Sequence, residues 1–348
     1  MIYIRATGNI SPQNTFGQAS FLREPVEHTG NRLTCIEPDY QEIIDAKLIR
    51  RMSRIIKMGV AAAMQCLKAA RVKVPNAVIT GTAYGCLQDT EVFLKRMVEN
   101  KEEMLAPTAF IQSTHNTVGS QIALLLQCHE YNNTFVHRGS SFENALLDAT
   151  MLLLENPDKN VLVGAVDEIT NTSHALLSRM GLYRQLPVSS LNLFTPRSKG
   201  TIAGEGAAFF LLAGRPSQTD IAKLEAITTF YNPGGLTGTE QSISSFLASR
   251  SIDISDIDLI ITGRNGDEKN DRAYDQLQQS VLKGPMSVNY KHLCGEYPTS
   301  AGFALWLAVT ILQTGQQPAA PSQQPAARRI LIYNYHNKYH SLLLVSAC

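Results

Sequence analysis

The chain has 348 residues, of which 44% are hydrophobic and 18% are charged, and its formal net charge is +1. This length allows one large domain or two fused halves with an ample core. The small net charge argues against bulk electrostatic binding to nucleic acid. No segment approaches the ~20 consecutive apolar residues that a spanning helix needs. We therefore expect a globular protein with neither a nucleic-acid partner nor a membrane span.

The cysteines and the start of the sequence predict a reduced, cytoplasmic protein. No two cysteines form a C-x-x-C pair, so neither a zinc site nor a redox motif is indicated. No apolar run follows a basic start, so no secretory signal is predicted, and the thiols are expected to be reduced. We expect no metal and no cofactor. The cysteines are Cys35, Cys66, Cys86, Cys128, Cys294 and Cys348.

Strands and helices alternate through the first part of the chain, which predicts a mixed sheet covered on both faces. The strand at 207–213 is expected to be the edge of this first half. The expected strands are 2–6, 77–80, 134–137, 160–166 and 207–213. The expected helices are 49–70, 90–104, 117–128 and 142–155.

A join near 214–217 leads into a second alternating part. The helix at 300–314 is nearly all apolar, so we expect it to be buried. The Pro/Gln/Ala-rich stretch 316–327 is expected to be a surface connection. The expected strands are 222–231, 257–262, 330–333 and 341–346, and the other expected helices are 240–250 and 271–281.

The turn Gly139-Ser140-Ser141 connects a short strand to the helix that starts near Phe142. Either serine is suited to cap that helix. A strand that delivers its tip to the start of a buried helix is a common place for a nucleophile, because the partial positive charge of the helix end stabilises a developing anion. This turn is therefore the first candidate for a functional site.

The same plan, with T-A-C-S-S at the turn and N-A at the same distance into the helix, marks the β-ketoacyl synthases of the thiolase fold, which this chain resembles. Aligning Asn144-Ala145-Leu146 with that pattern puts Gly139 where the family has its catalytic cysteine. The stretch T-P-R-S-K-G-T-I-A-G-E-G-A resembles the family's R-x-G-x-x-x-G-E-G-A. The resemblance implies a thiolase-like α/β fold built as a dimer, with two fused halves at 1–214 and 215–348, the second shortened.

The family's two histidines are also replaced in this sequence. The first opens H-G-T-G-T after a strand, and its counterpart here is Arg264, or Asn265 if the register slips by one. The second lies in K-S-x-x-G-H, where Lys291 is retained and Glu296 stands in place of the histidine. The family's closing G-F-G-G-x-N loop falls near residues 335–340, which contain no glycine.

The resemblance therefore implies a relative without catalytic residues. Gly139 has no side chain to acylate, and a Glu296 anion would repel a carboxylate substrate where the family needs a neutral donor. We expect Arg264 to pair with Glu296 across the emptied pocket.

Several segments look like the chain-length-factor-type ketosynthases of aryl polyene and flexirubin clusters, notably R-R-M-S-R, G-T-A-Y-G-C-L-Q-D-T-E and H-R-G-S-S-F-E-N-A. The resemblance implies a heterodimer with a catalytic ketosynthase, an acyl carrier protein as second partner, and an acyl or polyene chain in a shared tunnel. Tunnel positions would be Thr114, His115 and Phe135. Carrier docking would use Lys47, Arg50, Arg51 and Arg54, for which a plain solvated helix end is the alternative.

Two other functions stay open on the sequence. One is an enzyme, either a divergent acyltransferase with Ser140 as nucleophile or a decarboxylase that forms no acyl-enzyme. The other is a homodimeric acyl-binding protein. Capping is the favoured role for Ser140 and Ser141, since no His–Asp pair is placed by sequence to activate them.

Three other side chains each have a structural and a functional interpretation. His115 is either an interface residue or a buried, hydrogen-bonded histidine. His336 and His340 are spaced for a surface role rather than for metal binding. Cys294 lies near the expected pocket in sequence, and a small buried hydrophobic role is favoured over a reactive one.

Overall fold

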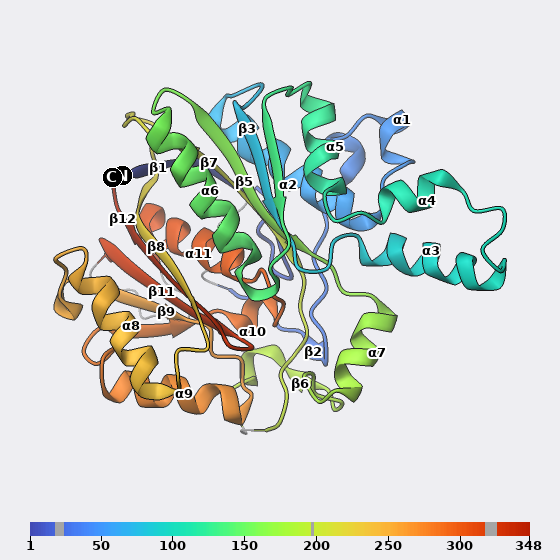
Figure 1. Cartoon of the computed structure of the whole chain (residues 1–348). Helices are drawn as coiled ribbons and strands as arrows, with labels where there is room; N and C mark the ends of the chain where they lie inside the picture. The colour runs from blue at the N-terminus through green and yellow to red at the C-terminus, as the bar shows by residue number, and fades with distance from the viewer. Residues whose placement is uncertain (18–23, 196–197, 317–325) are drawn as a thin grey trace.

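The computed structural model describes residues 1–17, 24–195, 198–316 and 326–348. Within these residues, ten strands form one continuous sheet in the order β10-β9-β11-β12-β8-β1-β7-β5-β3-β4 (Figure 1). Most of the connection expected at 316–327 lies outside the described residues. The strands of the sheet are β1 (Ile2–Ile10), β3 (Ala77–Gly81), β4 (Tyr131–Phe135), β5 (Asn160–Asp167), β7 (Gly206–Ala213), β8 (Ala222–Tyr231), β9 (Leu259–Thr262), β10 (Met286–Asn289), β11 (Arg329–His336) and β12 (Tyr339–Ser346).

The sheet contains one pairing pattern twice. From β1 outward, the β1–β7 and β7–β5 pairs are antiparallel, and the β5–β3 and β3–β4 pairs are parallel. From β8 outward, the β8–β12 and β12–β11 pairs are antiparallel, and the β11–β9 and β9–β10 pairs are parallel. The antiparallel β1–β8 pair joins the two patterns. The sequence showed no such repeat; the domain boundary at 214/215, which falls between β7 and β8, remains a prediction.

Helices form three layers around the two halves of the sheet. The central core cluster contains α6, α11 and residues from both halves, so these two helices lie between them. A second cluster packs α2 and α5 on the outer face of the first half, and a third packs α8 and α9 on the outer face of the second. The result is the layered α/β architecture of a thiolase-like fold. These helices are α2 (Arg54–Ala70), α5 (Thr117–Leu126), α6 (Ser141–Glu155), α8 (Leu236–Ala248), α9 (Glu268–Gln279) and α11 (Ala301–Thr314).

Two sequence predictions about these elements are wrong. The strand expected at the edge of the first half, β7, lies between β1 and β5, and all its residues are buried. The long helix expected over 49–70 is broken into α1 (Ala46–Ile49) and α2, because Ser53 is extended at the start of α2. Strand β10 was not predicted; it is short and ends the sheet opposite β4.

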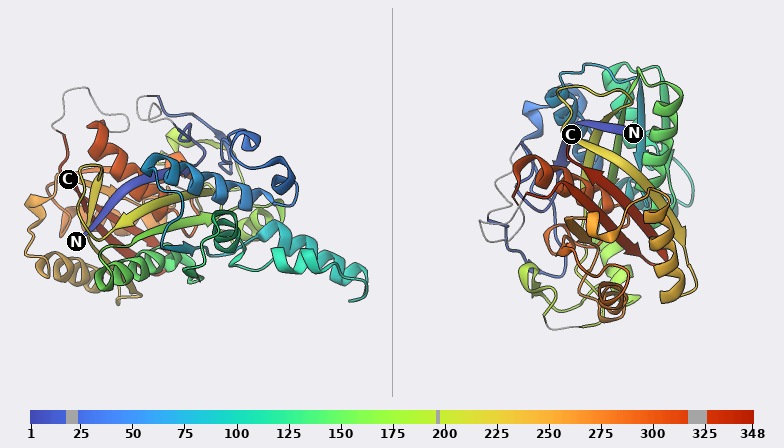
Figure 2. Two further views of the ribbon diagram at one scale, coloured as in Figure 1. Left: turned by 90° about the horizontal axis from the view of Figure 1, so that it is seen from above. Right: turned by 90° about the vertical axis from the view of Figure 1, so that its left-hand side faces the viewer.

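A helical arm extends from the first half of the molecule. It consists of α3 (Leu87–Glu99) and α4 (Pro107–Gln112), and it stands out from the body in two orthogonal views (Figures 1 and 2). None of the residues of either helix, all of which the structure describes, is buried. The rings of Phe93 and Phe110 hold the two helices together, with centroids 5.5 Å apart. The arm thus exposes apolar side chains that the body of the protein does not cover.

Among the described residues, no helix combines the length and the apolar character that crossing a membrane requires.

Candidate functional site

The turn that precedes α6 packs directly against His336, which belongs to the other half of the molecule. Gly139 is buried in a single 3-10 turn, Arg138–Ser140, directly before α6. A Cβ atom at Gly139 would lie 3.0 Å from His336 Cδ2, 3.1 Å from its Cβ and 3.2 Å from its carbonyl oxygen. Two of these atoms do not move when the imidazole rotates, so a side chain at position 139 needs the neighbouring backbone to give by a few tenths of an ångström. His336 therefore occupies the space beside the expected nucleophile position.

The two serines of the turn have different roles. Ser140 is the N-cap residue of α6, but its side chain makes no capping hydrogen bond, so the predicted capping role is wrong for Ser140. Ser141 donates from Oγ to the Arg138 carbonyl at 2.9 Å and accepts from the His137 N–H at 2.8 Å. Among the described residues, no imidazole or carboxylate forms a hydrogen bond with either hydroxyl, so the turn contains no activated serine.

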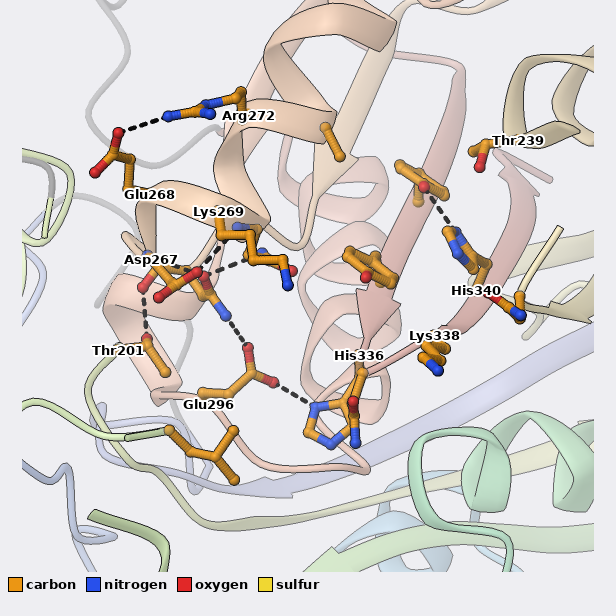
Figure 3. Close-up of a pocket in the computed structure, with 18 of the residues that line it drawn as sticks. Thr201, Thr239, Asp267, Glu268, Lys269, Arg272, Glu296, His336, Lys338 and His340 are labelled. Atoms are coloured by element: carbon orange, nitrogen blue, oxygen red, sulfur yellow. Dashed lines mark hydrogen bonds and ion pairs between the residues drawn. The ribbon is translucent and has the colours of Figure 1, made fainter. Parts of the chain in front are cut away.

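Glu296 is the centre of a buried hydrogen-bond network. Its Oε1 accepts from Lys291 Nζ at 2.8 Å and bonds His336 Nδ1 at 2.9 Å. Its Oε2 accepts from Lys291 Nζ at 2.7 Å and from Asn265 Nδ2 at 2.6 Å. The Lys291 side chain has no exposed surface. Figure 3 shows how Glu296 and His336 approach each other from separate segments.

The network keeps Glu296 ionised. Burial alone would raise the pKa of this carboxyl, but the Lys291 charge and the His336 hydrogen bond hold it at about 2. A buried ion pair is tolerated when its remaining hydrogen-bonding positions are also satisfied, as they are here. With both oxygens occupied, Glu296 is a structural anion rather than a free general base.

The small residues of the G-E-G motif position Glu296. The backbone N–H of Glu296 donates to the Ile202 carbonyl, and the Glu296 carbonyl accepts from the Gly204 N–H. A Cβ atom at Gly204 would lie 2.0 Å from the Cys294 carbonyl, so only glycine allows this close approach. The motif that supported the family resemblance therefore brings the two halves together at the site.

Asn265, and not Arg264, reaches Glu296. The Asn265 N–H is held by Asp271 Oδ1 at 2.9 Å, which fixes the loop after β9. The Arg264 guanidinium instead lies 2.8 Å from Asp275 and 3.8 Å from Asp271, both on α9. The expected Arg264–Glu296 pair is therefore wrong, because two closer carboxylates of α9 hold the guanidinium.

The β11–β12 hairpin brings His336 and His340 to opposite faces of the sheet. Asn337 and Lys338 form its tip, both with positive φ (45° and 73°), as a tight two-residue hairpin requires. His340 is buried and its ring stacks on Phe230. Its Nδ1 forms a hydrogen bond with the Tyr333 hydroxyl. The expected surface role is thus wrong for both histidines. The described residues contain no cluster of three or more potential metal ligands.

A cleft of about 740 Å³ opens beside this network. Figure 3 shows it between the loop before α9 and the tip of the hairpin, with Glu296 and His336 at one end. Gly139 is not among the lining residues, since His336 separates it from the cleft. A molecule that enters the cleft therefore meets the network and not the turn before α6.

The expected tunnel residues lie around the base of the arm and on β4, the strand at the edge of the sheet. His115 is exposed and packs on Gly85, so its interpretation as a buried histidine is wrong. Thr114 and Phe135 are half-buried. These positions suit an interface, and their role in a tunnel remains a prediction.

Burial decides the state of Cys294, whose side chain has no exposed surface. Burial raises the pKa of the Cys294 thiol well above its ordinary value, although the Lys291 charge opposes this. Since the thiolate is the reactive form, this supports the interpretation of Cys294 as a small buried hydrophobic residue.

The basic cluster divides into two parts. Lys47, Arg50 and Arg51 are exposed in and after α1. Arg54 instead donates to both oxygens of the buried Glu205, at 2.7 and 2.5 Å, and to Glu37 at 2.5 Å. Arg54 therefore fixes the start of α2 against the G-E-G segment, and only the first three side chains are available at the surface.

Sequence reasoning missed His336 as a member of the site. The residue lies 40 positions after Glu296, in the segment 335–340 that was matched to the family's closing loop, but that match gave no contact between His336 and Glu296. Asn265 was named only as the second choice for its position. The signal that would have favoured it is Gly266, whose positive φ of 79° bends the chain directly after it.

Comparisons with known proteins agree with this architecture. Residues 34–201 match the family described as "Beta-ketoacyl synthase, N-terminal domain". The ishigamide ketosynthase/chain length factor structure is 16% identical, with a TM-score of 0.82 over 100% of this chain and 99% of that chain. The chain has a ketosynthase fold. No curated protein matches the sequence.

Two further solved structures with this ketosynthase fold are similar. The ketosynthase ApeO in complex with its chain length factor ApeC, from Xenorhabdus doucetiae, is 16% identical with a TM-score of 0.75, over 100% of this chain and 98% of that chain. The AntDE:AntF complex, a type II polyketide acyl-carrier protein with its ketosynthase, is 16% identical with a TM-score of 0.75, over 100% and 99%. At this identity the likeness establishes the fold alone, which catalytic and non-catalytic subunits share.

Proposed function

We propose that this chain is a chain-length-factor-like, non-catalytic ketosynthase subunit. The observation that carries the proposal is the contact between Gly139 and His336. The expected nucleophile position, Gly139, has no side chain, and a Cβ atom there would lie only 3.0 to 3.2 Å from atoms of His336. The proposed subunit would bound the tunnel of a partner enzyme instead of carrying the acyl group itself.

The exposed apolar arm supports the proposal that a partner subunit binds here. Phe110 and Ile111 on α4 are 57% and 61% exposed, and Met104 between the helices is 95% exposed. Edge strand β4 lies in the same half and has a free hydrogen-bonding side beyond β3 among the described strands. Apolar side chains of this size in a contiguous region are typical of protein interfaces.

The proposed partners are a cysteine-bearing ketosynthase, an acyl carrier protein and the growing chain of an aryl polyene or related polyene. Lys47, Arg50 and Arg51 are exposed and suit an acidic carrier protein. The similar structures that hold a ketosynthase with its chain length factor, or with a carrier protein, make these partners the first to test.

Co-expression tests the proposal directly. The full chain is purified with and without a cysteine-bearing ketosynthase expressed in the same cells, and native mass spectrometry measures the stoichiometry. We expect a one-to-one heterodimer that elongates a malonyl-derived chain, whereas the isolated subunit elongates nothing and gains no acyl mass from an acyl-thioester.

Each alternative gives a different result in this experiment. An adduct on Ser140 of the isolated chain would establish the acyltransferase function and overturn the proposal. A homodimer that binds acyl chains and ignores the ketosynthase would establish the acyl-binding function. Loss of carrier binding on reversal of Lys47, Arg50 and Arg51 to glutamate, with the heterodimer intact, would locate the docking surface.

A further inference from the structure

A second carboxylate is buried behind the closed turn and is not part of the Glu296 network. Glu143 lies in the first turn of α6 and its side chain has no exposed surface. Neither of its two oxygens has a hydrogen-bond partner within the described part of the chain. A buried carboxylate with no partner costs several kcal/mol in either protonation state, so native proteins seldom leave one unsatisfied.

Two other unsatisfied polar side chains face the same space. Asn334 and Ser341 are directly opposite each other in the β11–β12 pair, and they are 1% and 2% exposed. Asn334 Nδ2 and Ser341 Oγ also lack partners among the described residues. Side chains alternate along a strand, and Ile332 and Leu343, two positions away on each strand, belong to the core that contains α6. Asn334 and Ser341 therefore point toward α6.

The Ser341 hydroxyl is close enough to Glu143 to lower the pKa of its carboxyl, yet the two do not meet hydrogen-bond geometry. The other polar group nearby is Tyr290, which donates to Asn334 Oδ1 at 2.9 Å and leaves Nδ2 free. Three unsatisfied groups, from α6, β11 and β12, thus lie on the facing sides of the helix and the hairpin, where Glu143 supplies acceptors and the Ser341 hydroxyl and Asn334 Nδ2 supply donors.

We propose that Glu143, Ser341 and Asn334 enclose a buried hydration site, in which ordered water donates to Glu143, bridges it to Ser341 and accepts from Asn334 Nδ2. Buried water typically makes about three hydrogen bonds to groups that the protein leaves unsatisfied, and this site offers that number. The water connects the first turn of α6, which follows Gly139, to the hairpin that carries His336. The site does not depend on the proposed function. It holds the hairpin in place against the first turn of α6.

The charged surroundings determine how the site titrates. Lys291 is the cation whose charge acts on Glu143, and its ammonium group is bound to Glu296, which in turn forms a hydrogen bond with His336. Tyr290 is the other titratable neighbour. Burial raises the pKa of Glu143 to about 7, against the smaller opposing effects of Ser341 and Lys291. Water at the site lets the carboxyl change protonation state without leaving a donor or acceptor unpaired.

A crystal structure of the full chain, at a resolution that reveals ordered water, tests the site. We expect water within hydrogen-bond distance of a Glu143 oxygen, Ser341 Oγ and Asn334 Nδ2. A direct Glu143–Ser341 hydrogen bond with no water density between α6 and the hairpin would overturn the proposal.

A pair of variants tests the same site in solution. Glu143→Gln keeps a polar, nearly isosteric side chain that water can bridge, whereas Glu143→Leu removes it and leaves Ser341 and Asn334 unsatisfied. Urea unfolding at pH 7 should give an unfolding equilibrium constant about tenfold smaller for E143Q than for E143L. The reverse order would indicate a dry site and contradict the proposal. Exposed Glu103→Gln is the control, and it should match the parent chain.

Discussion

The α3–α4 arm and the Glu296 network differ in the burial of their side chains: the arm exposes apolar groups, whereas the network buries charged ones. The arm carries large apolar residues, none of them buried. The network buries two charges, Lys291 and Glu296, and satisfies both oxygens of the carboxylate. Here the Glu296 network, which reaches Gly139 through His336, pairs its buried charges within the chain, whereas the arm leaves large apolar side chains exposed.

The largest expected effect comes from removing the cation of the network. Lys291→Met leaves Glu296 as a buried anion with fewer partners, so we expect a loss of about 3–5 kcal/mol in the free energy of unfolding. Denaturant unfolding at neutral pH measures it. The double variant Lys291→Met/Glu296→Leu should recover most of this loss, because it removes both charges. A single variant as stable as the parent would show that the pair is not coupled in the folded protein.

The acid stability of the protein should reveal the charge on Glu296. Its pKa is lowered from 4.5 to about 2, so the carboxylate stabilises the fold above pH 4.5 and this contribution is lost as the pH falls toward 2. A shift of this size corresponds to about 3 kcal/mol. We expect the stability difference between the parent and Glu296→Gln to shrink over that window, in unfolding curves recorded at each pH. A difference that stays constant with pH would contradict an ionised Glu296.

The arm is expected to contribute to binding and not to folding. Ile111→Ser should weaken the heterodimer by about 2 kcal/mol, in the range of an apolar anchor residue, as measured by calorimetry or by the dissociation rate. The stability of the isolated chain should change much less, because Ile111 is 61% exposed before any partner binds. The matched control is Met286→Ser on β10, at the opposite edge of the sheet. Equal effects from both variants would remove the arm from the interface.

The smallest effect is expected from the substitution that introduces a thiol at position 139. Gly139→Cys places a side chain against His336, so we expect a loss of about 1–3 kcal/mol from overpacking and no acyl adduct by intact-mass analysis. Adding His336→Gly should recover part of the stability and expose the thiol to a small alkylating reagent. If Gly139→Cys alone is acylated and retains full stability, then the hairpin does not close the site.

Local patterns predicted most of the elements. Apolar runs gave the positions of β3, β5 and β7, because a buried strand needs apolar side chains over most of its length. Strand β8 instead has buried residues that alternate with half-buried ones over its first half. They failed at β10 and at the break before α2, where neighbouring elements rather than local sequence determine the conformation. The strand expected at an edge, β7, is internal because β1, from the other end of the first half, adds beside it.

By itself the sequence determined the fold class and the absence of a thiol at position 139, because glycine has no side chain in any conformation. It also identified Lys291 and Glu296 as members of the site, because they fall at the lysine and histidine positions of the K-S-x-x-G-H motif that this segment resembles. Only the tertiary structure decided the partners of Glu296. Asn265 follows β9 and His336 ends β11, and the parallel pairing of these strands brings both residues to the same end of the sheet. Arg264 is held elsewhere by the closer carboxylates of α9.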